Sequence, residues 1–539
     1  IIADSVGLGK TWIAKKIIEK RGYYRRENIL VICPAQLKSM WSKELKSIDV
    51  KDNIISQEEL ASEDYLKKLK LVIKDNLSTI RLVVIDESHN FRNPLSNKWE
   101  HLFNLLSEHI TRKGKKPEIL MLTATPINNS IWDLYWQIML LTLQNQRTFS
   151  KDNIDNLFKF FKEVEKEGEP TLLSDLLNEI SVRRTRDYIV KNYPEAFVTI
   201  NNEEKRIIFP KRELENVNYS LEETYAGLYK EISEIITEKL TMAYYRLLEY
   251  KKDEELTREE EFLRGRMIAI EGIFSTILLK RLESSIEAFR ISIGKHINFL
   301  ITFKEYLYEG KLVTKEFFSK YLMNLDEELE DEEIIQSLED FNLEKYNTDA
   351  LIEDIDSDIK LLNTILDKAK TIKPKNDAKL SSLKEILFDL SKKGQVVIFT
   401  YYADTLNYIY KEINSDPKFS KIKIQAISSS GLTSKNPNER VRILEDFASH
   451  KVDILMSTDV LSEGQNLQSA QFLVNYDLHW NPTRMIQRAG RIDRIGSPFS
   501  KIHVYNFFPE KELETLLRLL EYLQKKISDI DHSVGLDQT

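Results

Sequence analysis

The chain has 539 residues and a net charge of −8, with 42% hydrophobic and 30% charged residues. This length exceeds one hydrophobic core, so we expect two or three domains. The single cysteine, Cys33, excludes an intrachain disulfide framework and favours a reducing, cytoplasmic compartment. No apolar run approaches the ~18–20 residues of a membrane-spanning helix, which argues against a membrane partner. The acidic balance argues against a protein that coats nucleic acid but leaves room for a local basic groove.

The first region, residues 1–202, alternates short apolar strands with helical stretches. Strands are expected at residues 29–33, 82–85 and 119–122. Such alternation is typical of an α/β domain with a parallel sheet. The sequence opens at Ile1 without an initiator Met, inside what we interpret as a strand, so we expect a fragment of a longer chain.

A glycine-containing loop follows directly after this opening strand. It contains Gly7 and Gly9, and it ends in Lys10 and Thr11 at the start of an amphipathic helix. Glycine lets backbone N–H groups approach a phosphate chain closely, and the helix N-terminus favours negative charge. Lys10 would pair the β- and γ-phosphates, and the Thr11 hydroxyl would ligate Mg²⁺. The strict motif has glycine where Asp4 stands, so an ordinary strand–turn–helix is the alternative.

Two later strand ends carry further polar groups. Asp86 and Glu87 follow the strand at residues 82–85, where parallel strands open into a ligand crevice. Asp86 is predicted to hold the metal and Glu87 to polarise the attacking water. Thr123 and Thr125 lie at the end of the third strand. The alternatives are a solvated helix start for the acidic pair and a plain turn for the threonines.

The middle region, residues 203–374, is expected to be mainly α-helical, with no convincing strand after residues 206–209. Within it, residues 326–360 hold 15 acidic residues and 2 basic ones. This segment is either a solvated acidic helix pair or linker, or a flap that mimics DNA and occupies a basic groove.

The last region, residues 375–539, returns to α/β alternation, with strands expected at 396–400, 424–427, 454–457, 472–476 and 503–507. Gln487, Arg491 and Arg494 are spaced i, i+4 and i+7, so on a helix they share one face. Two guanidinium groups on one face could reach a γ-phosphate presented by the first region. The alternative is an exposed amphipathic helix with salt bridges.

Together these segments resemble the motifs of superfamily-two helicases, over residues 1–200 and 375–510. The sequences Ala-Thr-Pro-Ile-Asn-Asn at 124–129, Arg-Arg-Thr-Arg at 183–186 and Tyr-Asp-Leu-His-Trp-Asn-Pro at 476–482 resemble the Swi/Snf-like branch. Residues 462–466 resemble its bacterial RapA/HepA-like members, which include phage-defence helicases. Residues 280–285 are similar to a segment of bacterial relatives.

The resemblance implies two RecA-like parallel-sheet lobes, with a mainly α-helical insertion between them and ATP in the cleft. Lys10, Thr11, Asp86 and Glu87 would form one half of the site, and Gln487, Arg491 and Arg494 the other. It also implies Gly464 as a nucleotide contact. Members of this branch track one strand of a duplex, so the expected partner is double-stranded DNA. A strand-separating DNA or RNA helicase, and a protein-remodelling factor that docks partners on the insertion, are the alternatives.

Nucleic-acid contacts in such a motor are expected at phosphates, which position the nucleic acid without specifying sequence. The candidates lie at strand ends across the cleft: Pro34, Ala35, Gln36, Thr123, Thr400, Tyr401, Ser457 and Thr458. Routine loop capping is the alternative for each. The arginines at 183, 184 and 186 either contact DNA or brace the two lobes.

Overall fold

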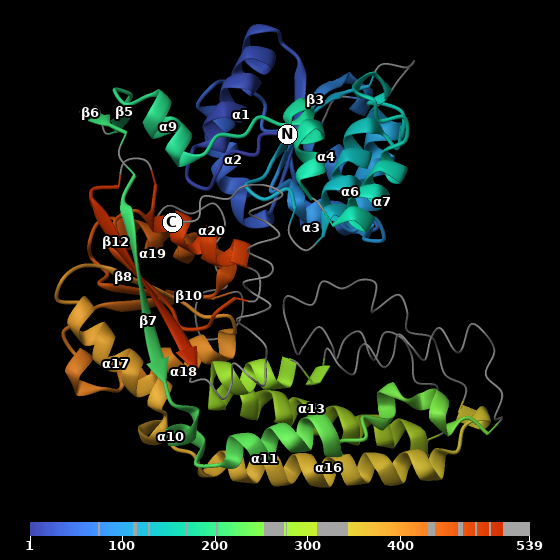
Figure 1. Ribbon diagram of the computed structural model, residues 1–539, viewed down its shortest axis with the longest axis vertical. Coiled ribbons are helices and arrows are strands. Elements are labelled where there is room, and N and C mark those ends of the chain that lie inside the picture. Colours follow the sequence, from blue (N-terminus) through green and yellow to red (C-terminus); the bar gives the residue numbers. More distant parts are fainter. Residues whose placement is uncertain are drawn as a thin grey trace.

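The computed structural model forms two α/β lobes and a helical bundle (Figure 1). It describes residues 1–509 apart from 74–75, 111–115, 128–129, 169, 201–202, 208, 253–273, 276, 310–342, 429–436, 462–466, 480–481 and 495–496. The predicted fold class, two parallel-sheet lobes separated by a mainly helical insertion, is confirmed.

Lobe 1 is built on a four-stranded parallel sheet in the order β2-β1-β3-β4. Its strands are β1 (Asn28–Cys33), β2 (Ile54–Ser56), β3 (Ile80–Asp86) and β4 (Glu118–Leu122). The opening segment adds a single parallel bridge from Ile2 to Leu122 and another from Ile2 to Val182. The phosphate loop therefore leaves the same sheet edge as the acidic pair.

Helices cover both faces of this sheet because every buried strand is apolar on both sides. Leu30 and Ile32 belong to one buried cluster, while Val31 and Cys33 belong to the other. The helices of lobe 1 are α1 (Lys10–Ile18), α2 (Lys38–Lys46), α3 (Gln57–Ala61), α4 (Tyr65–Val72), α5 (Asn97–Asn104), α6 (Ile131–Thr142), α7 (Leu157–Glu167), α8 (Ser174–Ile180) and α9 (Arg186–Asn192).

Lobe 2 has a six-stranded parallel sheet in the order β7-β12-β11-β8-β10-β9. Its strands are β7 (Lys211–Tyr219), β8 (Val396–Phe399), β9 (Ile424–Ile427), β10 (Ile454–Ser457), β11 (Phe472–Asn475) and β12 (Lys501–Pro509). Its helices are α17 (Ala378–Leu390), α18 (Ala403–Asn414), α19 (Pro437–Ala448) and α20 (Pro482–Ile492).

Strand β7 corrects the sequence interpretation, which expected no strand after residues 206–209. It pairs with β12 along its whole length, and the two run side by side in Figure 1. As an edge strand it is half exposed and largely polar, so it lacks the apolar run by which the inner strands were recognised. Just before it, β5 (Phe197–Ile200) and β6 (Glu203–Arg206) form an antiparallel hairpin.

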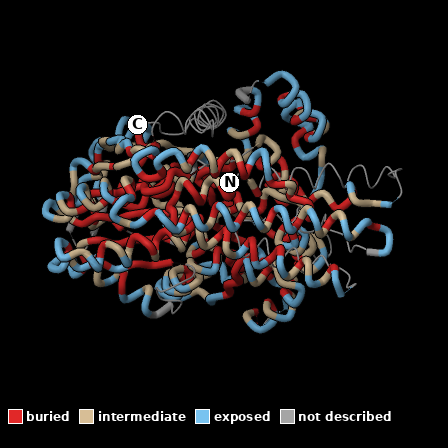
Figure 2. Tube along the Cα trace, turned by 90° about the horizontal axis from the view of Figure 1, so that it is seen from below, coloured by how far each residue is buried: buried red, intermediate tan, exposed pale blue. Residues whose placement is uncertain are grey.

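The insertion consists of helices that share a core with lobe 2. They are α10 (Leu221–Tyr225), α11 (Leu228–Glu234), α13 (Ile286–Tyr308) and α16 (Thr348–Thr371). One continuous buried cluster runs from Phe289 and Leu362 in these helices to Ile398 and Val474 in the sheet. Figure 2 shows buried residues gathered in the middle of the molecule and exposed residues mainly along its margins. None of the helices described here is both long and apolar enough to cross a membrane.

The segment at residues 280–285 anchors this insertion to lobe 2 through polar contacts. Ser284 donates to Asp477 at 2.8 Å, and Lys379 pairs with the same carboxylate at 2.9 Å. Arg281 pairs with Asp404 of α18 at 2.8 Å. Within the acidic segment, residues 326–342 lie outside the described residues, whereas residues 348–360 form the first half of α16. Whether the segment acts as a flap stays a prediction.

Candidate nucleotide site between the two lobes

The phosphate loop has the backbone that its sequence predicts. Gly7 and Gly9 have φ values of 84° and 82°, a left-handed conformation that glycine adopts without steric cost. Lys10 is the first residue of α1, and its Nζ donates to the carbonyl oxygen of Asp4 at 3.0 Å. The loop therefore curls around the Lys10 ammonium at the N-terminus of a helix, which is the arrangement that binds phosphate.

Asp4, the departure from the strict motif, has a structural partner. Its buried carboxylate accepts from the Arg184 backbone N–H at 2.9 Å and from the guanidinium at 3.0 and 2.5 Å. Asp4 thereby fixes the start of the loop to the segment that follows Val182.

The acidic pair lies at the end of β3, beside the phosphate loop. Asp86 accepts from Trp41 Nε1 at 2.8 Å, and Gln57 donates to its carbonyl oxygen at 2.8 Å. Neither Trp41 nor Gln57 was predicted as an orienting residue, because each comes from a helix that carries no local motif. Glu87 has a φ of 48°, an uncommon value for a non-glycine residue and one that concentrates at functional sites.

The second wall of the cleft comes from α20 and the residues after it. Burial lowers the pKa of Lys10, the carboxylates of Glu87 and Asp86 oppose this, and the charge of Arg491 adds to it. Burial likewise lowers the pKa of Arg494 to about 9; Arg491 adds to the lowering and Glu87 opposes it. The two arginines of lobe 2 thus interact electrostatically with the lysine and carboxylate of lobe 1, and Arg494 Cγ would lie 3.5 Å from a Cβ added to Gly7 of the phosphate loop.

The helix carrying these arginines is shorter than predicted. α20 ends at Ile492, so Gln487 and Arg491 share its face, whereas Arg494 lies two residues beyond its end. Arg494 stays close because its Nε donates to the Gly490 carbonyl at 3.3 Å. The alternative of an exposed helix is wrong, since Gln487 and Arg491 are buried. Arg488 is fully buried and pairs with Asp459 at 2.5 Å, inside lobe 2.

The polar side chains at the cleft fit a nucleotide and its metal. Ser5 Oγ and Gln487 Oε1 are buried and have no hydrogen-bond partner among the described residues. A bound phosphate chain would supply an acceptor for the Ser5 hydroxyl, and the attacking water would supply a donor for Gln487 Oε1. The Thr11 hydroxyl and the Asp86 carboxylate are hard oxygen ligands of the kind Mg²⁺ takes with phosphates and water. The described part of the chain holds no cluster of three or more His, Cys, Asp or Glu that could bind a metal. Gly464 lies outside the described residues.

Most of the predicted nucleic-acid contacts have buried side chains. Thr123 is fully buried and its hydroxyl is bonded to His89 at 3.1 Å, so a phosphate contact through it does not fit this structure. The side chains of Pro34, Thr400, Ser457 and Thr458 are also buried, at or just after strand ends. Contacts from these four positions could be made only through the loop backbone, and they stay predictions.

Three of the predicted contacts remain at the surface. Ala35 is exposed, and Gln36 and Tyr401 are half-buried. The Tyr401 backbone N–H donates to Asp477 at 3.0 Å, and its ring lies 5.1 Å from that of His479.

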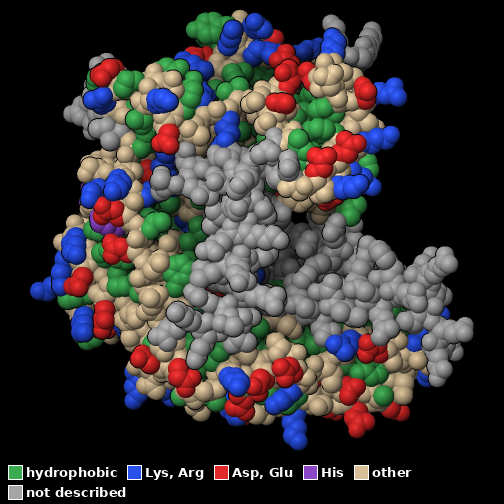
Figure 3. Space-filling model, in the orientation of Figure 1, with side chains coloured by type: hydrophobic (Ala, Val, Ile, Leu, Met, Phe, Trp, Pro, Cys, Tyr) green, Lys and Arg blue, Asp and Glu red, His purple; other side chains and the backbone are tan. Residues whose placement is uncertain are grey.

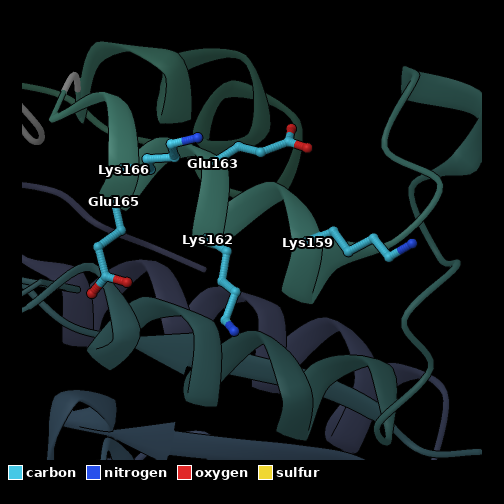
Figure 4. A pocket seen from close by; sticks show the side chains of 5 residues that line it. All are labelled: Lys159, Lys162, Glu163, Glu165 and Lys166. Carbon is cyan, nitrogen blue, oxygen red and sulfur yellow. The ribbon is translucent and has the colours of Figure 1, made fainter.

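A separate pocket lies beside α7, far from this chemistry in the sequence. All five of its lining residues come from that one helix: Lys159, Lys162, Glu163, Glu165 and Lys166. Figure 4 shows their side chains pointing in different directions, with both signs of charge. None of these five residues belongs to the candidate nucleotide site.

Comparison with known proteins agrees with this geometry. The family model of the SNF2-related domain matches residues 1–207, and the model of the helicase conserved C-terminal domain matches residues 378–496. The chain thus matches the two conserved domains of Swi/Snf-like superfamily-two helicases. This match implies nucleic-acid-dependent ATP hydrolysis, with ATP as the nucleotide.

Individual relatives of this helicase are distant. It is 25% identical to an uncharacterized ATP-dependent helicase of Bacillus subtilis, YqhH, over 99% of this chain and 76% of the relative. It is 22% identical to the ATP-dependent helicase fft2 of Schizosaccharomyces pombe, over 97% of this chain but only 38% of the relative. The Hef helicase domain of Pyrococcus furiosus has a TM-score of 0.42 and 17% identity, covering 96% of this chain and 94% of that one.

Proposed function

We propose that this helicase is an ATP-driven translocase that grips a DNA duplex without fully separating its strands. The observation that carries the proposal is the division of the candidate site between two lobes whose charged walls face each other. Glu87 and Lys10 lie on one side, and Arg491 and Arg494 on the other. A site that is complete only when two lobes meet can convert nucleotide turnover into relative motion of those lobes.

The residues divide the chemistry as follows. Lys10 and the arginines would neutralise charge that develops on the transferred phosphoryl group. Glu87 would polarise the attacking water, and Gln487 Oε1, an acceptor, would orient it. Mg²⁺, held by Thr11 and Asp86, would supply charge neutralisation at the β- and γ-phosphates. Hydrolysis would split ATP into ADP and inorganic phosphate, and departure of the phosphate would remove the charge that holds the arginines, so that the cleft could open for the next cycle.

Nucleic acid would be held mainly through loop backbones and a few surface side chains. Ala35, Gln36 and Tyr401 are the predicted contacts that lie at the surface. In Figure 3, charges of both signs are interspersed over the described surface of the face shown. A motor that contacts phosphates through backbone N–H groups needs no large basic patch.

One assay separates the candidate functions. ATP hydrolysis should be measured in parallel with double-stranded DNA, single-stranded DNA and RNA of equal length. We expect the largest stimulation with the duplex and no net strand displacement from a duplex with a single-stranded tail. Preferential stimulation by single strands, with displacement, would favour a strand-separating DNA or RNA helicase. Hydrolysis unaffected by any nucleic acid would favour a protein-remodelling factor that docks partners on the insertion. A cytoplasmic role in phage defence is a further hypothesis, tested by plaque counts with and without the gene.

A further inference from the structure

We infer that Arg186 and Asp493 are positioning residues that lock the second lobe onto the phosphate loop. The inference builds on the proposed function, because the lock matters to catalysis only if the arginines of lobe 2 complete the site. Neither residue is placed on the nucleotide; each acts through the groups beside it.

Arg186 holds both walls of the cleft with one side chain. It is the first residue of α9, in lobe 1, and is 9% exposed. Its Nη2 donates to the Val6 carbonyl in the phosphate loop at 3.1 Å and to the Asp493 carbonyl in lobe 2 at 2.9 Å. Its Nη1 pairs with the Asp493 carboxylate. The planar fork of an arginine suits this double contact, which a lysine could not reproduce.

Asp493 is the point in lobe 2 on which these contacts converge. It lies between Arg491 and Arg494 in sequence and is fully buried. Its Oδ2 also accepts from Arg212 of β7 at 2.5 Å, so one carboxylate joins the edge strand of lobe 2 to lobe 1. A buried carboxylate is costly unless it is paired, so Asp493 holds the side chains of Arg186 and Arg212 in place as its partners. Because Arg494 follows Asp493 directly in the chain, the contacts that hold Asp493 in place also restrict the position of Arg494.

The surrounding packing leaves little room for another arrangement. A Cβ added to Gly7 would lie 3.0 Å from the Asp493 carbonyl oxygen and 3.5 Å from Arg494 Cγ. A Cβ added to Gly490 would clash with the Val6 side chain. The phosphate loop and the end of α20 are therefore in direct contact at the lock, with Asp493 and Arg494 packed against Gly7.

The test combines hydrolysis with a direct measure of lobe separation. Arg186→Gln, Asp493→Asn and the double variant should each lower kcat for ATP at least tenfold and leave KM for ATP within about threefold. Because the two residues act as one unit, the double variant should be no slower than the slower single variant. Arg21→Gln is the matched control, since Arg21 pairs with Glu27 and Glu118 wholly within lobe 1.

Lobe separation is read from spin labels at Lys20 and Lys411, exposed residues in lobes 1 and 2, with the buried Cys33 replaced by serine. Pulsed dipolar spectroscopy should give a broader and longer distance distribution for Arg186→Gln than for the parent or the control. Arg186→Lys, which keeps the charge without the fork, should be intermediate and serves if the glutamine variant does not fold.

Unchanged distances, or losses in kcat that multiply in the double variant, would overturn the lock. If the parent chain hydrolyses no ATP with any nucleic acid, the proposed function fails, while the distance measurement still decides whether the lock exists.

Discussion

The two junctions of lobe 2 are built in contrasting ways. Toward the insertion, lobe 2 shares one continuous hydrophobic core that includes side chains of α13, α16 and the sheet. Toward lobe 1, none of the hydrophobic clusters found among the described residues contains side chains from both lobes. The cleft is joined instead by Arg186, Asp493 and close backbone packing.

This difference separates a permanent junction from one that can open. Pulling apart an apolar core exposes its whole area to water, at roughly 25 cal/mol per Å². A junction of ion pairs can exchange its partners for water and nucleotide at a much smaller net cost. We therefore expect lobe 2 and the insertion to move as one body against lobe 1.

The largest predicted effect comes from breaking the permanent junction at its polar anchor. Asp477→Ala should lower the free energy of unfolding by about 3–5 kcal/mol, because it leaves the buried ammonium of Lys379 without its carboxylate. Chemical denaturation followed by circular dichroism measures this. Asp356→Ala, which removes the more exposed pair with Lys304, should cost less than about 1 kcal/mol. Equal losses of unfolding free energy in Asp477→Ala and Asp356→Ala would contradict a special structural role for the Lys379–Asp477 pair.

Gly490→Ala should disturb the opening junction while leaving the stability of each lobe intact. The new methyl group would clash with Val6, so the cleft should close poorly and kcat for ATP should fall roughly a hundredfold, or about 2.7 kcal/mol. Alanine favours a helix over glycine, so the melting temperature should not fall. A variant that hydrolyses ATP normally would mean that Val6 and Gly490 do not meet during turnover.

A smaller, pH-dependent effect is expected at Glu283, beside the anchor. Burial raises the pKa of its carboxyl to about 7; Lys379 and Lys280 oppose this, and Asp477 adds to it. The folded state then holds the proton more tightly than the unfolded state, so stability declines as pH rises from about 4.5 to 7. Glu283→Gln should match the parent near pH 4.5 and exceed it above pH 7 by on the order of 1–2 kcal/mol. Denaturation midpoints that differ equally at both pH values would contradict the shift.

The fold was largely predictable because inner strands of parallel sheets are continuous apolar runs. Residues 29–33, 82–85 and 424–427 fall within or coincide with β1, β3 and β9. The edge strand β7 could not be found this way, because its residues are largely polar. They form a strand by pairing with β12, almost 300 residues later in the chain.

The candidate site was predictable where local chemistry decides and unpredictable where packing does. Gly7, Gly9 and Lys10 have the conformations their motif requires. The buried Thr123 hydroxyl is hydrogen-bonded to His89, and the Arg186 side chain is bonded to Asp493, more than 300 residues away. Sequence had left two alternatives for the arginines at 183–186, and for Arg186 the contacts favour the brace between lobes.

The central claim, that one ATP is completed by groups from both lobes, is tested most directly with Arg491→Ala. We expect binding of a fluorescent ATP analogue to remain within a few-fold of the parent, while hydrolysis stimulated by duplex DNA falls by about 10³-fold or more. Arg442→Ala, on an exposed side chain of the same lobe, should leave both quantities unchanged. Normal turnover by Arg491→Ala would contradict the account.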